Sequence, residues 1–170
     1  AVDVFCDFVG TGGTFGGIAR RLKGQRADIG AYIVEPEGAA VLSGAPLTDG
    51  SHRIQGGGYA MTDLPLVDPA LVDGYVVVSD EDAIEGARRL ARREGIVAGF
   101  SAGAVLVAAE RLLAEQYPGG TAVIVLAEIP GITPQRRSRR RSRDGAAGLE
   151  PHATETTGYQ DVGIGEAFDP

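Results

Sequence analysis

A glycine-rich stretch near the start of the chain has the residue types and spacing to bind an anion. It reads Gly10-Thr11-Gly12-Gly13-Thr14-Phe15-Gly16-Gly17 and lies between an apolar run, 2–9, and a helix-like run, 18–23. Glycines let the backbone turn tightly and bring several N–H groups to one point, and a helix N-terminus adds partial positive charge. Thr11 and Thr14 supply hydroxyls that can bond phosphate oxygens. We therefore expect this loop to bind a phosphate group.

The loop fits neither of two common nucleotide-binding patterns. A dinucleotide fingerprint that starts at Gly10 needs a glycine five residues later, where the chain has Phe15. A nucleotide P-loop ends in Gly-Lys-Ser/Thr, whereas here Gly17 is followed by Ile18. A glycine-rich turn that only joins a strand to a helix is the alternative to a binding loop.

The composition is that of one globular domain with an acidic surface. The chain has 170 residues, 44% of them hydrophobic, and its formal net charge of −7 argues against broad nucleic-acid binding. Cys6 is the single cysteine, so a disulfide within the chain is excluded, and its apolar surroundings indicate a buried structural thiol. The sequence shows no apolar run long enough to span a bilayer and no basic leader, which predicts a cytoplasmic protein.

Apolar strands alternate with helices along the chain. Strands are predicted near 2–9, 29–34, 75–78, 96–99 and 122–126, and helices over 14–23, 79–94 and 100–115. This alternation is typical of an α/β fold in which helices cover both faces of a parallel sheet. Ligands of such sheets bind at the carboxyl ends of the strands, where the Gly10 loop and the turn at 99–103 are both expected.

Capping residues indicate where two of these helices begin and end. Thr14 is expected to cap the first helix. Ser79 is expected to cap the second helix, with Asp82 as its reciprocal partner in a capping box, and Gly95 is expected to end that helix.

Five short motifs follow one another in order over residues 2–127. They are Val9-Gly10-Thr11-Gly12-Gly13-Thr14, Val34-Glu35-Pro36-Glu37-Gly38, His52-Arg53-Ile54-Gln55-Gly56-Gly57-Gly58, Val78-Ser79-Asp80-Glu81-Asp82-Ala83 and Ala98-Gly99-Phe100-Ser101-Ala102-Gly103-Ala104. Each motif alone is weak, but the ordered series resembles the C-terminal half of the cysteine synthase and cystathionine β-synthase family. These are pyridoxal-phosphate enzymes of the tryptophan-synthase-β type, called fold type II. The resemblance implies that the sheet belongs to the large domain of such an enzyme.

The resemblance also implies a cofactor and a set of residues that bind it. The cofactor would be pyridoxal 5′-phosphate, with its phosphate held by Gly10, Thr11, Gly12, Gly13 and Thr14. Gly57, within the loop 56–58, would lie beside the cofactor ring and the substrate, where a side chain would crowd the ring. Neither His52 nor Gln55 of the same motif is given a catalytic role, and no metal site is expected.

The family's reaction and partners follow from the same resemblance. The family replaces the β-substituent of an activated serine by sulfide and so makes cysteine, with the cofactor as electron sink. The implied partners are a small amino-acid substrate and, for a complete enzyme, further copies of the same chain. Neither a membrane nor a nucleic acid is an expected partner.

The chain departs from the family in two places. Lys23 is the only lysine and is expected on the surface beyond the first helix. The family's Schiff-base lysine belongs to a segment before the phosphate loop, so we expect the N-terminal half to be missing and the chain alone to be inactive. After the strand at 122–126 the family turns through a serine that meets the pyridine nitrogen, whereas here Ala127 leads to Glu128 and Ile129.

The sequence predicts a truncated α/β domain over 1–134 and a disordered, Arg-rich tail over 135–170.

Three functions stay open. The chain is part of a cysteine synthase-like enzyme, or a non-catalytic module that binds phosphate or pyridoxal phosphate. The least favoured function is anion or RNA binding through the arginines of 136–143, because the same tail carries many acidic residues.

Overall fold

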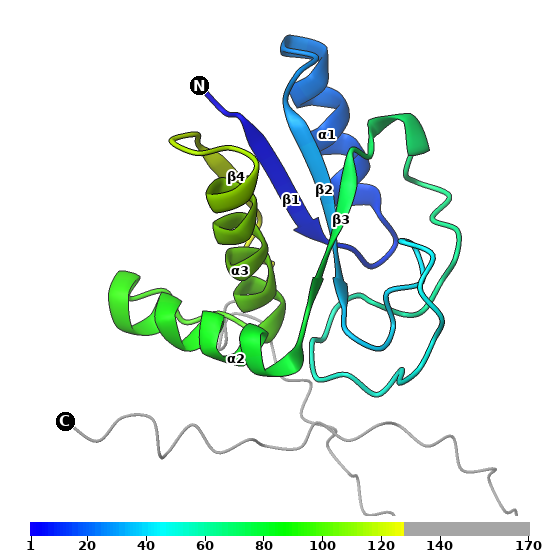
Figure 1. The fold of residues 1–170 in the computed structure, drawn as a ribbon, viewed down its shortest axis with the longest axis vertical. Helices are drawn as coiled ribbons and strands as arrows, with labels where there is room; N and C mark the ends of the chain where they lie inside the picture. Colours follow the sequence, from blue (N-terminus) through cyan, green and yellow to red (C-terminus); the bar gives the residue numbers. More distant parts are fainter. Residues whose placement is uncertain (128–170) are drawn as a thin grey trace, which may run out of the picture. The chain divides into compact units, whose positions relative to one another are not determined.

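The computed structural model describes residues 1–127, in which four strands form one sheet (Figure 1). The strands are β1 (Val4–Phe8), β2 (Gly30–Pro36), β3 (Gly74–Val78) and β4 (Ala122–Ile124), and their order across the sheet is β3-β2-β1-β4. Every pairing is parallel, with Phe8 opposite Val34 and Cys6 opposite Ile124. The predicted α/β class with a parallel sheet is therefore confirmed.

Three helices accompany the sheet: α1 (Gly13–Gln25), α2 (Asp80–Arg89) and α3 (Phe100–Glu115). A short 3-10 turn, η1 (Pro69–Leu71), precedes β3, and a π-helical turn, η2 (Leu90–Glu94), extends α2. Among the helices of residues 1–127, none has the length and apolar character needed to cross a bilayer.

Successive side chains of β1 point into two separate core clusters on the two faces of the sheet. Val4 and Phe8 pack with Leu112 of α3 in one cluster, whereas Phe5 packs with Phe15 of α1 in the other. The rings of Phe5 and Phe15 are stacked with their centroids 5.7 Å apart. Helices therefore cover both faces of the sheet, as the alternating pattern predicted (Figure 1).

Residues 96–99 form no strand, so one of the five predicted strands is wrong. Ile96 and Val97 are 37% and 41% exposed, and their segment pairs with no strand of the described sheet. An apolar run becomes a strand only where a neighbouring strand receives its backbone hydrogen bonds. Here the run instead connects Gly95 to α3. The other four predicted strands are confirmed, with small shifts of their ends.

The predicted cap of α1 is also wrong, because Gly12 rather than Thr14 is the N-cap. Gly12 has a φ of 83°, a left-handed conformation that glycine adopts without a steric penalty. Its carbonyl accepts a hydrogen bond from the N–H of Gly16 at 2.8 Å. The chain therefore enters the helix two residues earlier than predicted, and Thr14 lies in the first turn.

The prediction for α2 is confirmed in part. The Ser79 hydroxyl accepts a hydrogen bond from the N–H of Asp82 at 3.1 Å, and Gly95, with a φ of 69°, ends the extended helix. The reciprocal half of the capping box does not form. Instead the Asp82 carboxylate accepts a hydrogen bond from the guanidinium of Arg111 at 2.6 Å. Asp82 therefore joins α2 to α3.

The edge strand β3 leaves apolar side chains exposed. Tyr75 and Val77 are each 41% exposed and project from the same face of the strand. Exposed, contiguous apolar surface promotes association. We expect the chain to self-associate and to increase the fluorescence of an apolar dye, and the double variant Tyr75→Thr, Val77→Thr to reduce both signals, since threonine keeps β propensity.

Sedimentation velocity and dye titration test this expectation, with Glu81→Gln, an exposed change on α2, as the matched control. A strictly monomeric chain that unfolds cooperatively and binds no dye would contradict it.

Candidate phosphate-binding site

The Gly10–Thr14 loop leads from the carboxyl end of β1 directly into α1. The first backbone amides of a helix have no partner inside the helix. Within residues 1–127, the N–H groups of residues 11–15 donate no hydrogen bond, and no side chain caps α1. Five consecutive amides are thus available at a helix N-terminus, which is the arrangement that binds phosphate.

A pocket of about 300 Å³ lies against this loop. Its lining comes from the end of β1, the loop, the first turn of α1, a glycine loop and the segment after β4: Asp7, Phe8, Val9, Gly10, Thr11, Gly12, Gly13, Thr14, Gly56, Tyr59, Val125 and Ala127. The five loop residues that the sequence indicated therefore share one pocket. Their role in cofactor binding stays a prediction.

The glycine loop 56–58 is held against the end of β1. Gly58 donates a backbone hydrogen bond to the Val9 carbonyl at 3.1 Å, and a Cβ on Gly57 would overlap that same carbonyl oxygen. A Cβ on Gly10 would come within 2.8 Å of the Gly56 carbonyl oxygen. Gly56 lines the pocket, whereas Gly57 is buried against Val9 and is not part of the lining. The structure thus gives Gly57 a packing role.

His52 supports this loop from the side. Its Nε2 lies 2.9 Å from the Gly58 carbonyl oxygen, and its ring meets Phe8 edge-on with the centroids 6.4 Å apart. His52 is not among the residues that line the pocket. The contacts of His52 position the glycine loop.

Asp7 is a charged pocket residue that the motif-based reasoning missed. Its side chain is 6% exposed and lies on the α1 face of β1, between the alternating residues Cys6 and Phe8 that face α3. Burial raises the pKa of Asp7 to about 6, and the backbone N–H of Phe8 acts in the opposite direction. The available signal was an acidic residue in an otherwise apolar strand.

The raised pKa of Asp7 has a defined effect on stability. The folded state holds the Asp7 proton more tightly than an unfolded chain, whose aspartate has a pKa near 3.8. Its contribution to stability is therefore greatest below pH 3.8 and is lost as the pH rises through about 6.

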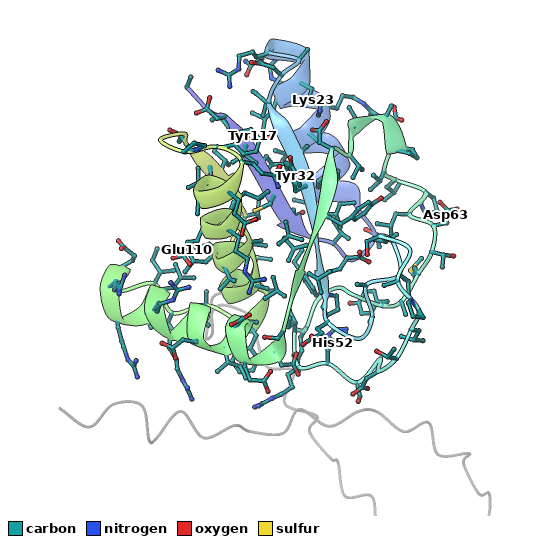
Figure 2. The ribbon with its side chains drawn as sticks, in the orientation of Figure 1. Lys23, Tyr32, His52, Asp63, Glu110 and Tyr117 are labelled. Carbon is teal, nitrogen blue, oxygen red and sulfur yellow. The ribbon has the colours of Figure 1, made fainter. Side chains whose placement is uncertain are left out.

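Lys23 lies far from the pocket and within α1, not beyond the end of that helix as predicted. Its side chain is 15% exposed, and its ammonium group contacts the Asp73 carboxylate at 2.6 Å. Asp73 also accepts a hydrogen bond from the N–H of Ala31 at 2.7 Å. Figure 2 shows Lys23 and His52 at opposite ends of the sheet. The pair with Asp73 fixes the C-terminal part of α1 beside β2.

Cys6 is a buried structural thiol, as predicted. It is fully buried, and its Sγ donates to the Val105 carbonyl of α3 at 3.6 Å. Burial raises the pKa of the Cys6 thiol to about 12, and the neighbouring Asp7 acts in the same direction. A thiol with so little thiolate is a poor nucleophile.

Glu35 of the second motif is also structural. Its buried carboxylate accepts hydrogen bonds from the N–H groups of Leu42 and Ser43 at 2.7 and 2.9 Å. These bonds hold the segment that follows β2.

Comparison with known proteins adds a family to this geometry. Residues 1–128 match the family of pyridoxal-phosphate dependent enzymes. Cysteine synthase A of Escherichia coli is 40% identical over 132 residues, which are 74% of this chain and 41% of that protein. A cysteine synthase of Staphylococcus aureus is 38% identical over 125 residues, 74% of this chain and 39% of that protein.

Solved structures similar to this chain are enzymes of the same kind as these curated relatives. O-acetylserine sulfhydrylase isoform 3 from Entamoeba histolytica superposes with a TM-score of 0.70 at 33% identity, over 75% of this chain and 38% of that one. An O-acetylserine dependent cystathionine β-synthase from Helicobacter pylori superposes with a TM-score of 0.66 at 33% identity, over 75% and 40%. The chain spans about two fifths of the length of the curated relatives it matches, 41% and 39%.

Proposed function

This chain belongs to the family of pyridoxal-phosphate dependent enzymes, and we propose that it is the phosphate-holding C-terminal portion of a cysteine synthase-like enzyme. The enzyme would make cysteine by β-replacement on an activated serine, an activity suggested by the names of its relatives. One observation carries the proposal: five consecutive backbone amides, 11–15, are available at the carboxyl end of β1 and the N-terminus of α1.

The residues around the pocket fit the phosphate of the cofactor. The free amides and the hydroxyls of Thr11 and Thr14 are donors of the kind that bind phosphate oxygens. Gly10 and Gly56 meet so closely that a side chain on Gly10 would overlap the opposite backbone. Bound pyridoxal phosphate would supply an electron sink for chemistry at the substrate α-carbon. The chain's own part would be to bind and orient the phosphate.

A non-catalytic binding module is the second candidate, and the position of Lys23 favours it for this chain alone. Lys23 is the only lysine of the sequence and is paired with Asp73 at the far end of α1.

The serine-free turn after Ala127 and the arginines of 136–143 lie outside the described residues. RNA binding through those arginines, the tail's disorder, the domain division at 134, assembly into oligomers and a cytoplasmic location stay predictions.

Substitution of Gly13 tests the phosphate site directly. A Cβ on Gly13 would meet only the Leu66 side chain at 3.5 Å and the Thr11 hydroxyl at 3.9 Å, so a side chain can start there without overlapping the backbone. We expect Gly13→Leu to weaken binding of inorganic phosphate about tenfold or more, because the side chain would stand beside the free amides and displace charge-assisted hydrogen bonds worth about 1.5–3 kcal/mol each. Amide chemical shifts of residues 11–15 during a phosphate titration give the affinities.

Gly17→Leu on the same helix is the matched control, because a Cβ there meets nothing within 4 Å. Gly12 is unsuitable for this test. A Cβ on Gly12 would overlap the Val67 side chain, and its φ of 83° disfavours other residues, so a bulky replacement disturbs the fold as well as the site. Equal phosphate affinities for Gly13→Leu and the unchanged chain would contradict the proposed site.

A further inference from the structure

Asp7 places a buried carboxyl group in the wall of the pocket that is proposed to bind an anion. Asp7, Gly13 and Thr14 line the same pocket, and Asp7 is 6% exposed. Apart from the N–H of its neighbour Phe8, no group among residues 1–127 donates a hydrogen bond to this carboxyl, and no cation of these residues forms an ion pair with it. The donors proposed to bind phosphate are the loop amides and the threonine hydroxyls, and Asp7 is not one of them.

The two protonation states of this carboxyl have opposite effects on a nearby anion. An ionised carboxylate is an acceptor only and repels a phosphate or sulfate, all the more strongly where burial lowers the local dielectric constant. A protonated carboxyl has an O–H that can donate a hydrogen bond to an anion oxygen. Anion binding therefore favours the protonated form, and protonation in turn favours anion binding.

We propose that Asp7 makes anion binding in this pocket depend on pH, so that a phosphate-type anion binds tightly when the Asp7 carboxyl carries a proton and weakly when it is ionised. This inference rests on the proposed function, because it requires that the Gly10–Thr14 loop binds an anion. It assigns a specificity-determining role to a residue outside the glycine-rich loop.

The surroundings of Asp7 support a titration at accessible pH. Burial already raises its pKa to about 6. The elements packed around it contribute few other titratable groups. β2 places Ile33 opposite Asp7, α1 contributes Gly13 and Thr14, the segment after β4 contributes Val125, and Tyr59 is the other titratable residue of the lining.

Two further groups near Asp7 lie outside the pocket lining. The Cys6 thiol faces α3, and its pKa of about 12 keeps it neutral. His52, which contacts Phe8 and Gly58, is not part of the lining.

Sulfate titrations of the 170-residue chain test the inference, because sulfate keeps the same charge over the pH range in which Asp7 would titrate. Amide shifts of residues 11–15 report binding. We expect the sulfate affinity to be about tenfold or more higher at ~pH 5 than at ~pH 8, since one pKa unit of coupling corresponds to a factor of ten. Asp7→Asn, which keeps a donor and cannot ionise, is expected to bind with the same affinity at both values of pH.

The control variants separate the possible outcomes. His52→Gln should retain the pH dependence, which excludes the histidine as its source. Asp7→Ser provides a second non-ionising variant should the amide disturb packing. Binding that is independent of pH in the unchanged chain, or pH dependence that persists in both Asp7 variants, would overturn the inference alone. Absence of sulfate and phosphate binding at every pH, in Asp7→Asn as well, would overturn the inference together with the proposed function.

Discussion

The 170-residue chain by itself is expected to make no cysteine from O-acetylserine and sulfide. Enzymes of this family hold their cofactor through a lysine, which also moves a proton at the substrate. The single lysine here, Lys23, follows Gly13 by ten residues, or about 15 Å along a helix at 1.5 Å per residue. It is also engaged in an ion pair with Asp73 and is only 15% exposed. Neither its position nor its partner suits it for chemistry at the Gly10 loop.

Borohydride reduction followed by peptide mapping, together with an assay of cysteine formation, tests whether Lys23 holds the cofactor and whether the chain is active. After incubation with pyridoxal phosphate, we expect no stoichiometric label on Lys23 and turnover no higher than in a protein-free blank. Lys23→Gln is the control, because it removes the lysine and leaves the amino terminus as the remaining primary amine. Cofactor trapped on Lys23 together with cysteine formation that disappears in Lys23→Gln would show that this chain is catalytic in its own right.

The Gly10–Thr14 loop, the candidate phosphate site, could be predicted from sequence because the chemistry expected of it is carried by the backbone. Glycine and threonine types between an apolar run and a helix specify available N–H groups almost independently of the rest of the fold. The same reasoning placed the helix cap at Thr14, which was wrong, because it favoured side-chain caps over the left-handed conformation that Gly12 adopts. Local sequence thus located a glycine loop that leads into α1 and placed the start of that helix wrongly.

Residues whose role depends on a distant segment could not be assigned in this way. Three consecutive glycines, 56–58, suggested a loop beside the cofactor, but the sequence alone does not show that Gly58 bonds to the distant Val9 or that Gly56 lines the pocket. Asp7 belongs to the pocket because the first turn of α1 and the segment after β4 both line that pocket beside it. The run at 96–99 had strand-like residues and no strand to pair with.

Gly103 shows that a family-like motif can reflect packing rather than chemistry. The motif around it was predicted as a turn after a strand at 96–99, but that strand does not form, and Gly103 lies near the start of α3, where that helix meets α2. A Cβ on Gly103 would overlap the Ala83 carbonyl oxygen of α2, and a Cβ on Gly86 would overlap the Gly103 carbonyl oxygen. The backbones of the two helices therefore approach so closely that neither position has room for a methyl group.

Gly103→Ala is accordingly expected to destabilise the fold strongly. Overpacking typically costs about 1–3 kcal/mol and sometimes more. Here the obstacle is backbone, which cannot move aside as a side chain does. Alanine in a helix recovers about 1 kcal/mol relative to glycine, so we expect a net loss of about 2 kcal/mol, and a larger loss for Gly103→Leu. A lower urea midpoint with an unchanged slope would report this loss.

Gly17→Ala on α1 provides the matched comparison, because it introduces the same methyl group into a helix where nothing lies within 4 Å. We expect this variant to be more stable than the unchanged chain by about 0.4–1 kcal/mol, through the reduced entropy of the unfolded state. The two glycine-to-alanine changes should therefore have opposite signs. If Gly103→Ala were as stable as Gly17→Ala, the close contact between α2 and α3 would not exist in solution, and the packing assigned to Gly86 and Gly103 would be wrong.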